Sequence, residues 1–333
     1  MSMSVEAQLA SPMFRRNYSS VQMADGRVFV TGGYDAENAE LGPAIYDSVA
    51  NSWLTLPEPR HRRSGTIVAL DTGHVLMVGG HVSSCHSLER DRFSEAKARI
   101  GESLDVVTGH WSELPPADFW PPVNQANVAS LPKGRAVFFA PLVPANADET
   151  STLAIYDAVK KSWTQSPPAP FHAHARNTTT IVLGSETLLF PEHRFTYCLR
   201  DHEWRAFSQP WTKLRLARYA QSGTYLVAVG MVDNLDCGVS TLNCQNWEWR
   251  TLPSPPSGAL GGVLVPLSDG STLALGGHAE RVTIGNRDGR QGWIERVIRI
   301  ASSEDKWEEI LRLGASHALG GIFGIENDRV LLL

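Results

Sequence analysis

One sequence pattern recurs about every fifty residues along this chain, and it constrains the fold more than any other feature. Each copy contains a strand-like segment, a tight turn, β-branched residues that mostly end in glycine, a further strand and a tryptophan. The first copy reads SSVQMADGRVFVTGG and then AIYDSVANSWLTLP; the sixth reads GGVLVPLSDGSTLALGG and then IERVIRIASSEDKWEEI. The tryptophans that mark the copies are Trp53, Trp111, Trp163, Trp204, Trp247 and Trp307. Repeats of this length and composition predict an all-β fold, a β-propeller.

Each repeat is expected to form one four-stranded antiparallel blade, with residues 1–333 making a single propeller domain. The first strand of each blade is small and apolar, as in TTTIVL, because the inner strands converge on the propeller axis. The glycines after the second strand let the backbone turn without a Cβ clash. The tryptophan begins the fourth strand and packs between neighbouring blades. Copies three to five are weaker, and Pro191 stands where the fourth should carry its glycines.

The number of blades depends on the two ends of the chain. The final segment, SHALGGIFGIENDRVLLL, resembles only the first two strands of a further repeat. The segment SVEAQLASP near the N-terminus stands where the last strand of a preceding repeat would be. Because open strand edges promote aggregation, we expect these segments to pair and close a seventh blade. The alternative is six blades, with the final segment as an irregular cap.

Composition and charge exclude several classes of partner. The formal net charge is −5 and the sequence pI is about 6.1, so there is no electrostatic case for nucleic acid or an acidic membrane surface. No basic, apolar leader and no membrane-spanning apolar stretch is visible, which predicts a cytoplasmic protein. Four cysteines lack metal-type spacing: Cys85, Cys198, Cys237 and Cys244. Reduced thiols are expected, and a Cys237–Cys244 pair across a hairpin is the alternative.

The glycine pairs and tryptophans resemble those of the kelch-repeat superfamily, which also contains the galactose oxidase propeller. The resemblance covers almost the whole chain, from about Arg15 to Leu333, which implies a stand-alone propeller without an adaptor segment. It implies little about function, because propellers include both enzymes and binding scaffolds. The copper-radical site of galactose oxidase has a histidine after a tyrosine. Here Tyr18 is followed by Ser19 and Tyr219 by Ala220, so copper-radical chemistry is not expected.

In kelch propellers, the loops before the first strand and after the glycine pair build one face. Most of the histidines map to that face: His61, His81, His86, His172, His174, His193, His278 and His317. His74, His110 and His202 map to turns on the opposite face. Imidazoles titrate near neutral pH, so such a cluster suits proton transfer. The alternative interpretation is that each histidine is simply solvated or structural, since polar residues collect in loops.

The predicted site places His81, His174 and His278 as proton-transfer groups, with Arg62 and Arg176 holding developing negative charge. The predicted substrate-binding residues are Arg16, Asn17, Tyr34, Arg62, Asn124, Trp120, Arg176, Asn177, Tyr219 and His317. Long loops over 81–102, 140–151 and 278–292 could act as lids over a pocket. His172 and His174 have the only spacing that suggests a metal, and neither a metal nor an organic cofactor is expected.

Two functions remain open at this point. The first is a cofactor-independent isomerase, lyase or cyclase acting on a small organic molecule, by analogy with pathway cyclases of secondary metabolism that are similar to kelch propellers. The second is a protein-interaction scaffold that recognises an acidic peptide on the same face. The sequence leans towards the enzyme because of its long loops, and it sets neither the substrate nor the oligomeric state.

Overall fold

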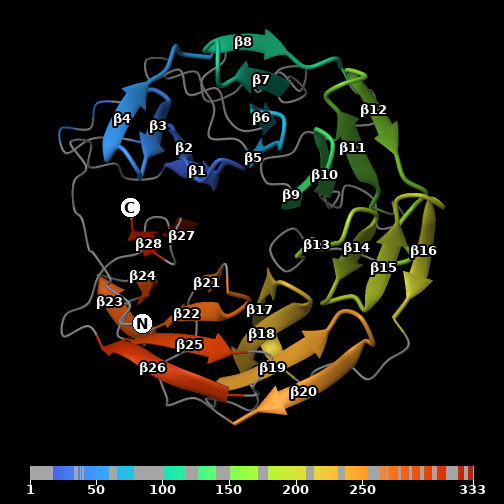
Figure 1. The fold of residues 1–333 in the computed structure, drawn as a ribbon, viewed down its shortest axis with the longest axis vertical. Helices are drawn as coiled ribbons and strands as arrows, with labels where there is room; N and C mark the ends of the chain where they lie inside the picture. Colours follow the sequence, from blue (N-terminus) through green and yellow to red (C-terminus); the bar gives the residue numbers. More distant parts are fainter. Residues whose placement is uncertain are drawn as a thin grey trace. The chain divides into compact units, whose positions relative to one another are not determined.

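The structure is a computed structural model, and its strands follow the repeats. The residues that it describes are 18–33, 37, 39, 41–59, 66–78, 101–116, 127–139, 151–171, 179–207, 214–231, 237–253, 263–267, 269–276, 279–284, 287–292, 296–301, 306–312, 322–325 and 329–332. Every regular element within these ranges is a β-strand (Figure 1). None of the described residues forms a helix that is long and apolar enough to cross a membrane.

The chain divides into two compact units, Pro12–Phe207 and Ser208–Leu333 with Met1–Ser11. The first unit holds four antiparallel sheets of four strands each, whose strands are neighbours in chain order. They are blade 1, with β1 (Ser19–Gln22), β2 (Val28–Thr31), β3 (Ala44–Asp47) and β4 (Ser52–Thr55), and blade 2, with β5 (Thr66–Ala69), β6 (His74–Val78), β7 (Gly101–Asp105) and β8 (His110–Glu113). Blade 3 has β9 (Asn127–Leu131), β10 (Arg135–Phe139), β11 (Leu153–Asp157) and β12 (Ser162–Gln165), and blade 4 has β13 (Ile181–Leu183), β14 (Thr187–Phe190), β15 (Phe195–Cys198) and β16 (Glu203–Ala206).

The second unit holds two more sheets of the same kind. Blade 5 has β17 (Arg215–Ser222), β18 (Tyr225–Met231), β19 (Cys237–Asn243) and β20 (Glu248–Leu252). Blade 6 has β21 (Val263–Pro266), β22 (Thr272–Gly276), β25 (Arg296–Ala301) and β26 (Lys306–Arg312). Between β22 and β25 the chain forms a separate hairpin, β23 (Ala279–Ile284) with β24 (Arg287–Gly292), where we predicted only a long loop.

These sheets confirm the all-β propeller class, with six complete four-stranded blades, the alternative number. The last repeat supplies two strands, as expected, and these form the two-stranded sheet of β27 (Ile322–Ile325) and β28 (Arg329–Leu332). We expected seven blades because a segment near the N-terminus should complete that sheet. Residues 1–17 lie outside the described residues, and the described strands make no seventh four-stranded blade.

The hydrophobic core lies between successive blades of each unit. One buried cluster joins Phe29 and Ile45 of blade 1 to Val75 and Met77 of blade 2, and equivalent clusters join blades 2 and 3, blades 3 and 4, and blades 5 and 6. A fourth-strand tryptophan packs against each of these clusters, as the repeat pattern predicted. Within each unit, burial between blades therefore holds successive blades together, because a single blade cannot cover both of its faces.

The same tryptophans also form hydrogen bonds across the blade junctions. The indole Nε1–H of Trp111 donates to the Pro57 carbonyl oxygen at 2.8 Å, and Trp163 donates to the Pro115 carbonyl oxygen at 2.8 Å. Trp204 and Pro167, and Trp307 and Pro253, make the same contact at 3.0 and 2.9 Å. Each proline follows the fourth strand of the preceding blade. The tryptophan of a repeat is therefore both a packing group and a hydrogen-bond donor to the blade before it.

The choice of Trp247 as the marker of the fifth repeat was wrong. Trp247 lies in the turn between β19 and β20 with φ of 63°, whereas Trp249 stands in β20 opposite Leu242. This is the position that Trp53 holds opposite Tyr46 in blade 1. The expected reduced thiols agree with Cys244, which is a free thiol, whereas the alternative, a pair with Cys237, does not; Cys237 begins β19 and Cys244 follows its last residue.

Candidate functional site

The two ends of each blade differ in how much the length of the connection between strands varies from blade to blade. At one end, here called the turn end, four residues separate the third strand from the fourth in every blade, as in 48–51, 106–109 and 158–161. At the other end, the loop end, the connection from the second strand to the third ranges from four residues in blade 4 (191–194) to twenty-two in blade 2 (79–100). The loop end thus carries most of the variation between repeats.

Aspartate side chains at the turn ends are engaged in holding the turns. The Asp105 carboxylate accepts hydrogen bonds from the backbone N–H groups of Val107 and Thr108 at 2.9 and 3.3 Å, and Asp47 and Asp157 do the same in their blades. The hydroxyl of Thr108 and these N–H groups lower the pKa of Asp105. Asp71 joins two blades, because it accepts the N–H groups of Lys133 and Gly134 at 2.8 and 2.6 Å.

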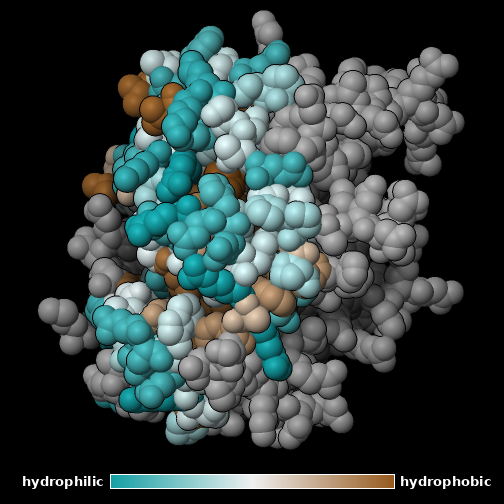
Figure 2. Space-filling model, turned by 90° about the vertical axis from the view of Figure 1, so that its right-hand side faces the viewer, coloured by the Kyte–Doolittle hydropathy of each residue, from teal (hydrophilic) through white to brown (hydrophobic). Residues whose placement is uncertain are grey.

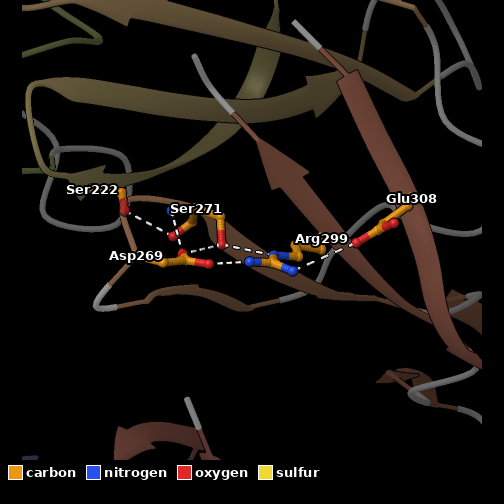
Figure 3. A network of polar contacts seen from close by, with 5 residues as sticks. All are labelled: Ser222, Asp269, Ser271, Arg299 and Glu308. Carbon is orange, nitrogen blue, oxygen red and sulfur yellow. Dashed lines mark hydrogen bonds and ion pairs between the residues drawn. The ribbon is translucent and has the colours of Figure 1, made fainter. Parts of the chain in front are cut away.

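Blades 5 and 6 are joined at their turn ends by a polar network (Figure 3). Ser222 donates its hydroxyl to the Ser271 carbonyl oxygen at 2.8 Å, and Ser271 donates its N–H and hydroxyl to Asp269 at 2.8 and 2.6 Å. Arg299 pairs with Asp269, donates to the Ser271 hydroxyl at 3.0 Å and approaches Glu308 at 3.7 Å. Every group in this network has a structural partner, so we assign it to stability rather than to ligand binding.

Blade 4 has the shortest loop end, and there the described residues form a compact polar contact. The turn 191–194 is closed by the His193 N–H, which donates to the Phe190 carbonyl oxygen at 3.1 Å, and Arg194 adopts φ of 58°. The Glu192 carboxylate accepts the N–H of Thr179 at 3.0 Å and its hydroxyl at 2.7 Å. Glu192 therefore fixes the segment that leads into β13.

An aromatic cluster lies beside this contact. The imidazole of His193 stacks on the ring of Phe171, with centroids 4.1 Å apart and an interplanar angle of 12°. Phe195 stacks on Phe171 at 5.4 Å, and Trp204 meets it edge-on at 5.4 Å. The side chains of Phe171, His193 and Phe195 are all partly exposed. Partly exposed aromatic rings held in fixed positions are typical anchors for a binding partner.

The described residues bear on the predicted site at a few positions only. Tyr219 lies within β17 opposite Ala228, several residues after the strand begins, and not in a loop. His193 lies at a loop end, and His74, His110 and His202 lie at turn ends, as predicted. The other predicted residues lie outside the described residues: His81, His174, His278, Arg16, Asn17, Tyr34, Arg62, Asn124, Trp120, Arg176, Asn177 and His317.

Two residues of the blade 4 contact were not among the predicted site residues. Thr179 and Phe195 have no motif of their own, and only the brevity of the segment between β14 and β15 indicates that Glu192 can reach back to β13. Among the described residues, no group of three or more His, Cys, Asp or Glu side chains is arranged to hold a metal ion.

Comparisons with known proteins give a partial match. No family model matches the chain. It is 30% identical over 106 residues to an F-box/kelch-repeat protein of Arabidopsis thaliana. The aligned part covers 30% of this chain and 27% of that protein, so the chain spans about a quarter of the length of the curated relative that it matches.

Proposed function

We propose that this β-propeller, part of which is similar to a kelch-repeat protein, is a binding scaffold that recognises a protein partner through the loop ends of its blades. The observation that carries the proposal is the contrast between the two ends of the blades. At the turn ends, the connections from the third strand to the fourth have a uniform length and are held by an aspartate in blades 1 to 3, whereas the connections from the second strand to the third, at the loop ends, differ widely in length. Recognition residues commonly lie on variable loops that a rigid scaffold positions.

The loop end of blade 4 supports a protein partner in particular. Its partly exposed Phe171 and Phe195, with the imidazole of His193, give an aromatic surface of the kind that is enriched in protein–protein interfaces. Glu192 fixes the adjacent backbone, so less conformational freedom is lost when a partner binds. The similarity to an F-box/kelch-repeat protein is consistent with such a role for the repeats.

The test compares partner capture by matched variants. Wild type, His193→Ala with Arg194→Gly, and Arg205→Ala are immobilised, and the proteins that each retains from extract are quantified by mass spectrometry. Arg205 is the control because it lies on the outer strand β16 in exposed ion pairs with Asp201 and Glu203. We expect a protein retained by wild type and by the Arg205→Ala variant and lost from the loop-end variant. Equal retention by all three would refute the role of this loop end.

Chemistry on a small organic molecule is the second candidate function. It is supported by the histidine pattern of the sequence, which predicts that eight of eleven histidines lie at the loop ends. We propose His81, His174 and His278 as its proton-transfer groups. Screening metabolites by their effect on the melting temperature of the protein tests this candidate. A ligand that raises the melting temperature of wild type, but not of the His81→Ala variant, would support it, and no shift with any compound would count against it.

A further inference from the structure

The turn end of blade 3 differs from the other described turn ends in its charge. Lys133 lies in the turn between β9 and β10, Arg135 begins β10, and Lys160 and Lys161 lie in the turn between β11 and β12. The three lysines are exposed and Arg135 is half-buried. The chain as a whole has a formal net charge of −5, so this group of cations does not follow from composition.

The carboxylates of this region already have partners. Asp157, the acidic residue of the same turns, accepts the N–H groups of Val159 and Lys160 at 3.1 and 2.9 Å and lies 3.7 Å from the Lys160 ammonium group. Asp71 of blade 2 accepts two backbone N–H groups of blade 3. Two carboxylates thus face four cations, and an excess of positive charge is left at this end of the blade.

Two of the lysines occupy backbone conformations that lysine rarely adopts. Lys133 has φ of 67° and Lys161 has φ of 51°. Glycine and asparagine are favoured in this left-handed region, because other side chains crowd the backbone there. At the position of Lys161, blades 1 and 2 follow that preference with Asn51 and Gly109, whereas blades 4 and 5 have His202 and Trp247 in the same left-handed region. Asparagine at either position would suit the backbone at least as well, so replacing both lysines removes their charges without straining the turns.

Apolar side chains accompany these cations. Val159 is 75% exposed between Asp157 and the two lysines, and Val107, at the equivalent position of blade 2, is 88% exposed. Val49 of blade 1 is 77% exposed at the same position. Figure 2 shows that hydrophobic side chains are few on a mainly hydrophilic surface in that view. Valines repeated at one turn position in three successive blades thus add an apolar component to the surface.

We propose that the turn end of blade 3 is a second interaction surface, which binds an acidic segment of a protein partner that also carries an apolar side chain. The four cations would attract and orient the acidic residues, and Val159 would contact the apolar one. A protein segment fits better than a nucleic acid, because exposed valines offer nothing to a phosphate backbone. The proposal is independent of the loop-end surface, since it rests on the opposite end of the blade.

The experiment measures binding of a fluorescein-labelled peptide rich in Asp and Glu around one leucine, by fluorescence anisotropy at low salt. The double variant Lys133→Asn/Lys161→Asn should bind at least about tenfold more weakly than wild type, and added salt should weaken wild-type binding. The thermal midpoint of the double variant should equal or exceed that of wild type, because asparagine suits the left-handed backbone better than lysine does. Arg200→Ala, which removes an exposed arginine from the equivalent turn of blade 4, is the matched control and should bind as wild type does.

Three binding results would overturn the proposal. The wild type would not bind the acidic peptide at millimolar concentration, the double variant would bind it as tightly as wild type does, or the affinity would not change when serine replaces the leucine of the peptide. A short DNA duplex that binds as tightly as the peptide would assign the surface to phosphates. Dimerisation of wild type that the double variant lacks would assign it to a second copy of the chain. A lower thermal midpoint of the double variant would make the two lysines structural.

Discussion

Replacing Trp163 by phenylalanine tests whether the hydrogen bonds between blades stabilise the fold. The change removes the indole N–H that donates to the Pro115 carbonyl oxygen at 2.8 Å in a partly buried setting. A phenyl ring retains most of the packing against Tyr156 and Phe138, whose ring centroids lie 4.8 and 5.6 Å from that of Trp163. The variant therefore isolates the hydrogen bond and a small part of the ring.

The expected loss of stability has two parts. A typical intramolecular hydrogen bond contributes about 1 kcal/mol to stability. We expect the loss of this bond to cost about 1 kcal/mol, because the Pro115 carbonyl oxygen that loses its donor is only partly buried. The smaller ring buries roughly 40 Å² less apolar surface, which at about 25 cal/mol per Å² adds about 1 kcal/mol. We expect the free energy of unfolding to fall by about 2 kcal/mol. Trp111→Phe is the matched comparison, and since its hydrogen bond is exposed to water we expect a smaller loss, of about 1 kcal/mol.

Urea unfolding followed by far-UV circular dichroism measures both variants, because the signal does not depend on the tryptophan that is removed. A Trp163→Phe variant that loses no more than the about 1 kcal/mol expected from the smaller ring would refute the contribution of the hydrogen bond. A Trp111→Phe variant that loses as much as Trp163→Phe would show that burial does not set the strength of these bonds.

Other predictions concern single polar groups. Glu192→Ala should lower the thermal midpoint by a few degrees, because it removes both acceptors of Thr179, and Glu192→Gln should lower it less; equal losses would refute the role of the charge. Burial raises the pKa of Asp269, but hydrogen bonds from Ser271 and the charge and hydrogen bond of Arg299 outweigh it, so the pKa lies below its usual value of 3.8. The stability that this carboxylate contributes is present above pH 4 and is lost as pH falls through the lowered pKa. By urea unfolding, Asp269→Asn should therefore be less stable than wild type at pH 7 and equally stable at about pH 2. A difference in stability that persists in acid would contradict this. Burial raises the pKa of the Cys244 thiol to about 11, so iodoacetamide at pH 8 should label it far more slowly in the folded protein than in urea, as followed by mass spectrometry; equal rates would show that the thiol is accessible and reactive.

The repeat pattern alone predicted most of the fold. The glycine pairs and tryptophans gave the blades, the order of their strands and the packing of tryptophans at the junctions. The error at Trp247 has a physical cause that the sequence contains. In the blades, the fourth-strand tryptophan stands six residues after the last residue of the third strand, as in Asp47 to Trp53, because the turn between them always has the same length. That spacing selects Trp249.

The candidate site was less accessible to sequence reasoning. The stacking of His193 on Phe171 depends on a four-residue turn in which Arg194 has a left-handed backbone conformation. Glycine in a sequence predicts that conformation, whereas arginine does not. The contact between Glu192 and Thr179 joins residues 13 positions apart that meet only when β13 and β14 pair in register. The basic turn end of blade 3 was missed because Lys133 and Lys161 are distant in sequence and each alone resembles an ordinary surface lysine.

The link from a tryptophan to the proline carbonyl of the preceding blade has an evolutionary consequence. At four places the junction between successive blades uses the same donor and the same acceptor. Loss or duplication of one such repeat would therefore bring together a tryptophan and a proline of the same kinds, and the indole N–H would keep its acceptor. A breakpoint anywhere between the proline of one repeat and the tryptophan of the next likewise leaves a tryptophan opposite a proline carbonyl. Recombination among the repeats that share this pair can thus change their number while the new boundary keeps the chemistry of the old one.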